Sequence, residues 1–219
     1  MKWSDYFNTS IGKQLQMSFT GIFLILFLIV HCYINMQIFY NDGGVHFSEA
    51  AHFMGTNFAI RIIEIGLFAF LILHVVQGLL LWVRNRSKRS IGRSGNKTTP
   101  WYRRSMALLG TLLLLFLIVH LSQFWGPNRL SQVTGGGELK LYDLMKEEFQ
   151  YAWVVIVYFL GCIALGWHLA HGFYSAFQHL GLGTHRYKNI MKGASVVFSI
   201  TVPLIFASMP LTFYLHWIN

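Results

Sequence analysis

The chain is poor in cysteine. Its 219 residues include only Cys32 and Cys162, which lie far apart and inside apolar runs. No Cys-x-x-Cys pair, Cys-x-x-Cys-His motif or zinc-type spacing occurs, which argues against covalently attached haem, iron–sulfur clusters and a disulfide framework. We therefore interpret both cysteines as small buried hydrophobic residues.

Charged residues are also scarce. They make up 11% of the chain against 54% hydrophobic residues, and the mean hydropathy is +0.48. These values are typical of an integral membrane protein rather than of a soluble domain. The polar N-terminal segment lacks the apolar core and cleavage site of a signal peptide, so we expect the first apolar run to stay in the membrane as a helix.

Long apolar runs are what the sequence does have. Each is close to or above the ~20 residues that a helix needs to cross ~30 Å of hydrocarbon. They predict a single all-α integral membrane domain over residues 1–219, with five transmembrane helices at approximately 18–40, 60–83, 105–125, 152–177 and 194–217. An odd number of spans places the two termini on opposite sides of the membrane.

Basic residues are unevenly distributed among the loops. Eight of the 17 lie in 84–104, and together with 178–193 and the N-terminal tail that side holds 13, against four on the other side. The positive-inside rule therefore predicts a cytoplasmic N-terminus. This topology, with contacts to anionic membrane lipid, explains the net charge of +9 without a nucleic-acid partner. The same basic face could also dock a soluble protein.

Two pairs of segments resemble each other within the chain. Residues 21–31 read GIFLILFLIVH and residues 110–120 read GTLLLLFLIVH, with the last six letters identical. Residues 74–78 read HVVQG and residues 168–172 read HLAHG, each a histidine with a glycine four positions later. The pattern predicts a two-helix unit repeated in the same orientation about a pseudo-twofold axis along the membrane normal.

The repeat places one histidine on each of the first four helices. It predicts that His31 faces His120 in the outer half of the membrane and that His74 faces His168 in the inner half. The two levels are expected to differ by about 10 Å along the normal. Facing neutral imidazoles can ligate a six-coordinate iron, as in b-type haem, so the four histidines predict two b haems held by a bundle of the first four helices.

Glycines and a fifth histidine accompany the predicted inner site. Gly78 and Gly172 lie one helical turn after His74 and His168, where a missing side chain would let a porphyrin lie against the backbone. His171 aligns with Gln77 rather than with a histidine, so we assign it a supporting role as a hydrogen-bond donor or acceptor. The alternatives are histidines that pack or relay protons in a transporter, and zinc, which usually recruits carboxylates or thiolates that are not near these histidines.

Two stacked haems would form an electron path across the membrane interior. The chain has no nucleotide-binding motif, so catalytic partners must supply that chemistry, and quinone is the natural membrane partner. Quinone chemistry moves protons with electrons and needs a proton-accepting group near the outer haem. The candidate residues are Glu64, Arg61, Glu49 and Asn128. The alternative for Glu64 is an interfacial ion pair with Arg61.

These features resemble a known family. Five helices, a cytoplasmic N-terminus, a histidine on each of the first four helices and H-x-x-[HN]-G on the fourth are similar to the di-haem cytochrome b anchor of succinate dehydrogenase and fumarate reductase, particularly the cytochrome b558 group. The resemblance covers nearly the whole chain. It implies that His74 and His168 bind the haem beside an iron–sulfur subunit, and that His31 and His120 bind the haem near an outer quinone site.

The resemblance also implies partners and location. A flavoprotein subunit and an iron–sulfur subunit would dock on the cytoplasmic face, menaquinone would be the quinone, and the chain would lie in a bacterial cytoplasmic membrane without catalysing a reaction alone. Some fumarate reductase anchors carry a glutamate two residues before the fourth-helix ligand, but Gly166 stands there in this chain, which favours succinate dehydrogenase. One alternative is a fumarate reductase anchor of the same family. The other is the di-haem b subunit of a hydrogenase or formate dehydrogenase, but the repeat and the basic inner face favour the succinate dehydrogenase family over this second alternative.

Overall fold

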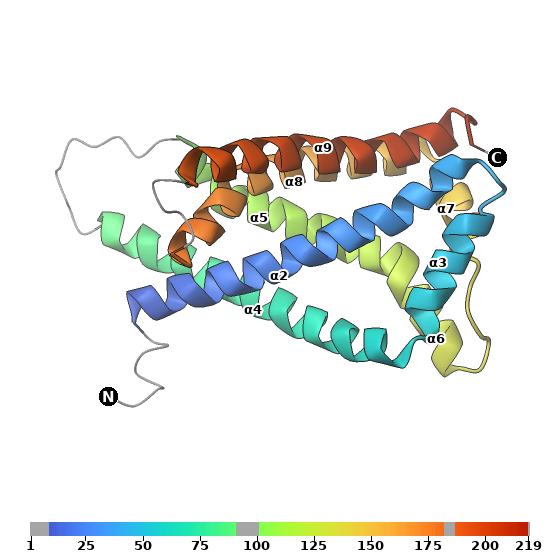
Figure 1. The fold of residues 1–219 in the computed structure, drawn as a ribbon, viewed down its shortest axis with the longest axis horizontal. Coiled ribbons are helices and arrows are strands. Elements are labelled where there is room, and N and C mark those ends of the chain that lie inside the picture. The colour runs from blue at the N-terminus through green and yellow to red at the C-terminus, as the bar shows by residue number, and fades with distance from the viewer. Residues whose placement is uncertain (1–8, 91–100, 182–186, 219) are drawn as a thin grey trace.

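A computed structural model describes residues 9–90, 101–181 and 187–218. All the regular structure in these ranges is helical (Figure 1). The elements in chain order are α2 (Ser10–Met36), η1 (Gln37–Tyr40), α3 (Val45–Thr56), α4 (Phe58–Ser90), α5 (Trp101–His120), η2 (Leu121–Trp125), α6 (Gly126–Val133), α7 (Leu141–Glu148), α8 (Ala152–His179) and α9 (Lys188–Tyr214).

Five helical segments are long and apolar enough to cross a membrane, which confirms the predicted number. They are Ile11–Tyr40, Phe58–Arg84, Ser105–Val133, Ala152–His179 and Lys188–Tyr214. The first helix begins earlier than expected because the Thr9 hydroxyl accepts a hydrogen bond from the Gly12 N–H at 3.0 Å and so caps it. The last helix, α9, ends at Tyr214, earlier than expected, and His216 just after it has a left-handed backbone conformation.

The third span continues past its expected end at residue 125 because the chain accommodates a proline without breaking. Pro127 has no N–H to offer the Gln123 carbonyl, and its ring would clash with that carbonyl in a regular α-helix. The turn η2 is instead a π-helix, and the Gly126 N–H bonds the Leu121 carbonyl. Such wide turns often mark functional sites. Here the turn follows His120 directly and joins α5 to α6.

The bundle has one close helix pair and one loose side. In Figure 1, α9 runs along one edge of the molecule beside α8, and α4 runs along the opposite edge. A Cβ on Gly166 would lie 3.0 Å from the Ser199 carbonyl oxygen of α9, which has no i+4 N–H partner because Pro203 supplies none. Within the described residues, no residue in the most apolar stretch of α4 or of the third span is fully buried. These two segments are therefore less tightly packed than α8 and α9.

The two ends of the bundle differ in charge. All seven described aspartate and glutamate residues lie at the end where α2 finishes, which we call the acidic end. The opposite end, where α2 begins, carries Lys13, Arg84, Lys188 and Lys192 among the described side chains, and we call it the basic end. Residues 91–100 and 182–186, which support the predicted orientation in the membrane, lie outside the described residues.

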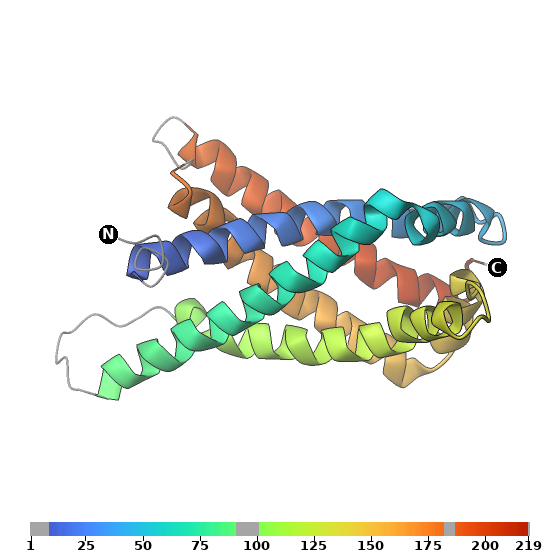
Figure 2. The same cartoon turned by 90° about the horizontal axis from the view of Figure 1, so that it is seen from below.

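Three short helices, α3, α6 and α7, lie at the acidic end. Figure 2 shows α3 and the α6–α7 region gathered there, far from the start of α2. The segment 137–150, GELKLYDLMKEEFQ, contains α7. It contributes to an apolar cluster that includes Phe47, Tyr142, Phe149 and Tyr158. The start of α3 is capped by Asp42, whose carboxylate accepts hydrogen bonds from the backbone N–H groups of residues 44, 45 and 46 at 2.9–3.0 Å.

Candidate functional site

A large cavity occupies the interior of the bundle. Its volume is about 1770 Å³, and its lining residues extend from Lys13 and His179 at the basic end to Glu64 and Arg129 at the acidic end. Most of the lining comes from α2, α4, α5 and α8. Ordinary small-molecule sites measure ~300–1,000 Å³. The cavity therefore has room for more than one large ligand.

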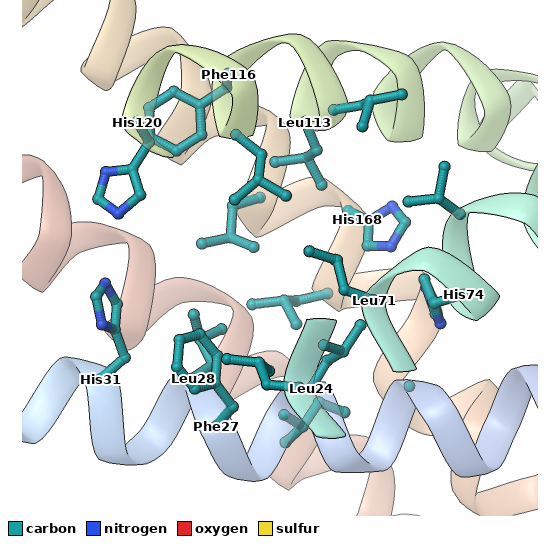
Figure 3. Close-up of a pocket in the computed structure, with 18 of the residues that line it drawn as sticks. Leu24, Phe27, Leu28, His31, Leu71, His74, Leu113, Phe116, His120 and His168 are labelled. Carbon is teal, nitrogen blue, oxygen red and sulfur yellow. The ribbon is translucent and has the colours of Figure 1, made fainter. Parts of the chain in front are cut away.

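Four histidines line this cavity in two pairs. The ring centroids of His31 and His120 are 5.8 Å apart, and those of His74 and His168 are 6.3 Å apart. Figure 3 shows the two pairs separated along the cavity, with leucine side chains between them. The structure thus brings together the same partners that the sequence repeat predicts. The ring planes are nearly perpendicular in the first pair, at 87°, and inclined at 67° in the second.

The spacing of each pair suits a metal held between two imidazoles. A metal–nitrogen distance of ~2.0 Å on each side, with a ring centre ~1.1 Å beyond each nitrogen, gives about 6 Å between centroids. Within the described residues, no group of three or more histidine, cysteine or acidic side chains could hold a metal ion. Each pair therefore offers two ligands, and an iron porphyrin, which carries its own four nitrogens, fits this donor set better than a bare ion.

Hydrogen bonds fix the orientation of His120. Its Nδ1 lies 3.3 Å from the Tyr158 hydroxyl, which donates its own proton to Gln123 Oε1 at 2.9 Å. The Tyr158 oxygen is therefore left to accept from the Nδ1–H of His120, so Nε2 keeps its lone pair for a ligand in the cavity. The chain continues to the acidic end, because Gln123 Nε2 donates to Glu148 at 2.7 Å.

The same logic applies to His74 in the second pair. Its Nδ1 lies 3.1 Å from the Thr20 hydroxyl, whose proton goes to the Gln16 carbonyl at 2.9 Å. The Thr20 oxygen therefore accepts from Nδ1–H, which again leaves Nε2 available. In His168, the partner of His74, Nδ1 is buried and has no hydrogen-bond partner among the described residues. A buried unpaired ring nitrogen is uncommon in packed interiors and is a reason to suspect a functional site.

Aromatic rings hold the first pair in place. Phe27 stacks on His31 with centroids 5.2 Å apart, and Phe116 stacks on His120 at 5.9 Å. In both helices the phenylalanine precedes its histidine by one turn, as the shared LFLIVH segment dictates. Stacking limits the rotation of each imidazole, so both rings keep their positions on the cavity wall.

The predicted glycines lie on the cavity wall. A Cβ on Gly172 would meet no heavy atom within 4 Å, and one on Gly78 would meet only the methyl group of Met17, at 3.6 Å. Both positions leave backbone accessible to a flat ligand. His171 also lines the cavity, but its Nδ1 lies 2.9 Å from the carbonyl oxygen of Trp167, on its own helix. That local contact fits the supporting role expected for His171.

A polar cluster borders the cavity at the acidic end, centred on Glu64. The Glu64 carboxylate accepts hydrogen bonds from Arg61 at 3.1 Å, Arg129 at 3.1 Å and the Trp125 indole at 2.6 Å. Gln132 accepts from both arginines, at 2.7 and 2.9 Å. Two guanidinium groups and one carboxylate leave a net charge of +1. The expected Arg61–Glu64 ion pair is present, but sequence reasoning missed Arg129 and Gln132.

The other two candidates near this end lie in different settings. Glu49 is exposed on α3 and is not among the residues that line the cavity. Asn128 does line the cavity, and its side-chain oxygen accepts a hydrogen bond from the Leu139 N–H at 2.9 Å. The structure therefore brings Glu64, Arg61 and Asn128 to one cavity and leaves Glu49 outside it.

The site therefore offers two pairs of imidazole ligands on the wall of one cavity and a charged cluster at its acidic end. The two histidine pairs, the hydrogen-bonded Nδ1 atoms of His120 and His74, and the glycine positions all fit a porphyrin iron. Comparison with protein-family models, curated proteins and solved structures found no match for this chain.

Proposed function

We propose that this chain is the cytochrome b membrane anchor of a succinate dehydrogenase, a succinate:menaquinone oxidoreductase. Two b haems would carry electrons between an iron–sulfur subunit and quinone. The observation that carries the proposal is the pair of histidine couples, with ring centroids 5.8 and 6.3 Å apart, on the wall of one large cavity. When bound, b haem supplies reversible one-electron transfer at its iron.

The residues of the chain act as ligands and as positioning groups in this proposal. His31 and His120 would hold one iron, and His74 and His168 the other. Tyr158 and Thr20 keep the Nδ1 protons of His120 and His74 in place, so that Nε2 of each ring would be free to hold an iron. Leucine side chains, among them Leu24, Leu71 and Leu113, lie between the two pairs, as Figure 3 shows.

The proposed quinone site lies at the acidic end. Quinone reduction consumes protons and quinol oxidation releases them, so a carboxylate beside the cavity is required. Glu64 meets this requirement, and Arg61 and Arg129 fix its position. Asn128 lines the same part of the cavity. In this proposal the acidic end faces the outside of a bacterial cytoplasmic membrane.

The proposed protein partners lie at the other end. A flavoprotein subunit and an iron–sulfur subunit would bind the basic end, with the N-terminus in the cytoplasm. Succinate dehydrogenase is preferred over a fumarate reductase anchor because Gly166 packs against the Ser199 carbonyl of α9, which leaves no space for a carboxylate at that position. A hydrogenase or formate dehydrogenase subunit would use similar haem chemistry with a different catalytic partner.

A reduced-minus-oxidised spectrum of the purified chain tests the haem part of the proposal. We expect a b-type α band and two haems for each chain, and a chain purified with full haem supply that shows no such band would refute the haem part of the proposal.

Co-purification then tests the complex. A flavoprotein and haem that succinate can reduce are expected, whereas haem reducible only by hydrogen or formate would transfer the proposal to the alternative complexes.

The ligand assignment is tested with a matched pair of variants. His168→Ala should remove one haem and spare the other, whereas His171→Ala, one turn away on the same helix, should retain both. Loss of a haem from His171→Ala but not from His168→Ala would reverse the assignment. Loss of the same single haem from His31→Ala and His74→Ala would contradict the pairing.

A further inference from the structure

A chain of hydrogen bonds links the His120 ring to a carboxylate outside the cavity. The Tyr158 hydroxyl lies 3.3 Å from His120 Nδ1 and donates to Gln123 Oε1 at 2.9 Å. Gln123 Nε2 in turn donates to the Glu148 carboxylate at 2.7 Å, so every proton in the chain points toward Glu148. His120 and Tyr158 line the cavity, whereas Glu148 does not. Glu148 can therefore act on this site only through the side chains that lie between them.

Apolar side chains surround the middle of this hydrogen-bond chain. Tyr158 is 6% exposed, and its ring packs against Phe116 and Phe149 with centroids 5.1 and 5.0 Å apart. The ring of Phe124 lies 6.3 Å away. Hydrogen bonds in such surroundings are electrostatically stronger than in water, and successive bonds polarise one another. A change of charge at one end of the chain therefore influences the other end.

The charge of Glu148 is not balanced by a neighbouring cation. Among the described residues its side chain accepts only from the uncharged Gln123 amide and forms no ion pair. Glu64, which lines the cavity, accepts instead from two guanidinium groups. Glu148 is partly exposed at the acidic end, so it can exchange protons with water. It thus combines an unpaired charge, access to water and a link to His120.

Other titratable groups lie on α7 and on the elements packed against it, which are α3, η2 and α9. On α7 they are Tyr142, Asp143, Lys146 and Glu147, and η2 has none. On α3 they are His46, Glu49 and His52, and α9 contributes Tyr214 at this end. His46 pairs with Asp42 and His52 with Glu138. In the described part of the chain, none of these groups pairs with Glu148.

We propose that Glu148 binds a proton when a metal site at His31 and His120 is reduced, and releases it when that site is oxidised. One electron enters from the iron–sulfur or quinol partner, and one proton enters from water at the acidic end. The added electron disfavours a negative charge at the far end of the hydrogen-bond chain, and the proton removes that charge. Glu148 is a positioning residue, since it acts through Gln123 and Tyr158. This inference rests on the proposed function, because it needs a porphyrin iron at His31 and His120.

The experiment measures the midpoint potential of the outer haem over a pH series. It uses the full-length haem-loaded chain in a His168→Ala background, which isolates that haem. Glu148→Gln keeps an oxygen that accepts from Gln123 and removes only the charge. Gln123→Met breaks the link, and Glu147→Gln, at an exposed neighbour on α7, is the matched control. Infrared difference spectra between the two redox states provide a second readout, because a protonated carboxyl has a C=O band that a carboxylate lacks.

The expected result is a potential that falls as the pH rises, because the reduced state holds one more proton. A tenfold difference in proton binding between the two redox states corresponds to a total fall of about 59 mV. Glu148→Gln should keep the acid-side potential at every pH and lose the carboxyl band that appears on reduction. Gln123→Met should weaken the pH dependence, and Glu147→Gln should leave it unchanged.

Other outcomes would overturn the inference. A potential independent of pH in the chain without these substitutions, or a pH dependence that Glu148→Gln retains, would show that Glu148 does not bind the proton. Loss of the pH dependence from Glu64→Gln alone would assign the proton to the proposed quinone site. An unchanged profile in Gln123→Met would exclude the hydrogen-bonded route, and loss of haem from Glu148→Gln would show a structural role. If the chain without any substitution bound no haem, the proposed function itself would fail.

Discussion

At the residue scale, the two histidine pairs differ in what holds them. His120 is connected through Tyr158 and Gln123 to the Glu148 carboxylate, whereas His168 has a buried Nδ1 without a partner among the described residues. A hydrogen bond from Nδ1–H makes an imidazole a stronger electron donor to its metal. The electronic properties of each site can therefore be altered separately through such neighbours.

Replacement of Tyr158 tests this coupling. Tyr158→Phe keeps the ring but removes the acceptor for the His120 Nδ1–H, so the ligand becomes a weaker donor. We expect both haems to remain and the midpoint potential of the outer one to rise by roughly 20–60 mV, which corresponds to the loss of one hydrogen bond. Redox titration measures it. Tyr33→Phe, at a 67% exposed position on α2, is the control and should change neither potential.

Replacement of Glu64 tests the proposed quinone site. Glu64→Gln keeps the size of the side chain but cannot accept a proton at neutral pH, so quinone-linked electron transfer should slow by about tenfold or more while both haems stay bound. Glu49→Gln, on exposed α3, is the matched control and should leave the rate unchanged. The assignments of the two carboxylates would be exchanged if only Glu49→Gln slowed the reaction.

At the element scale, two glycines on α8 have opposite surroundings. A Cβ at Gly166 would press on the Ser199 carbonyl at 3.0 Å, whereas one at Gly172 would point into the cavity. Gly166 thus serves helix packing, whereas Gly172 leaves open space on the cavity wall. A side chain at Gly166 would therefore disturb the contact between α8 and α9, whereas a side chain at Gly172 would occupy space in the cavity.

Alanine substitutions separate the two roles. Gly166→Ala should reduce the stability of the haem-free chain by about 1–3 kcal/mol, because it forces α8 and α9 apart. Gly172→Ala should leave that stability unchanged and instead reduce the inner haem content. Thermal unfolding of the haem-free chain and pyridine haemochrome assay measure these effects. A large loss of stability from Gly172→Ala would show that the position is packed.

The capped start of α3 predicts a dependence on pH. The His46 side chain and backbone lower the pKa of Asp42 from 3.8 to about 2, and the Val45 N–H contributes to the same shift. A carboxyl whose folded pKa is depressed stabilises the fold above its unfolded pKa and loses that contribution as pH falls toward 2. The protection of the α3 amides against hydrogen exchange should therefore decrease as the pH falls from 3.8 toward 2. Asp42→Ala should exchange fast at every pH, and an unchanged pH profile in that variant would contradict the role.

At the scale of the whole molecule, the five membrane-length helices could be predicted because long apolar runs are visible in the sequence itself. The histidine partners followed from the repeat alone. Arg129, Gln132 and the Tyr158–Gln123–Glu148 chain were missed, because their contacts depend on how the third span passes Pro127 through a π-turn. Sequence patterns fix which residues share a helix face, but not how a wide turn rotates the residues that follow.

The loose packing of α4 and of the third span predicts that the fold depends on its ligand. In the proposed function haem would bind the folded chain and not the unfolded one, so saturation at 100-fold above the dissociation constant should add about 2.7 kcal/mol for each site. Unfolding midpoints with and without haem measure the effect. A haem-free chain that unfolds at the same midpoint as the loaded one would argue against ligand-filled packing.

The distribution of the histidines along the chain has a further consequence for biogenesis. His31 and His74 lie on α2 and α4, and their partners lie on α5 and α8, so neither half of the chain holds a complete pair. Each haem would bridge two segments that are synthesised and inserted into the membrane at different times. Haem retention would thus report that α8 has joined the bundle, and chain halves 1–100 and 101–219 should hold haem together but not apart.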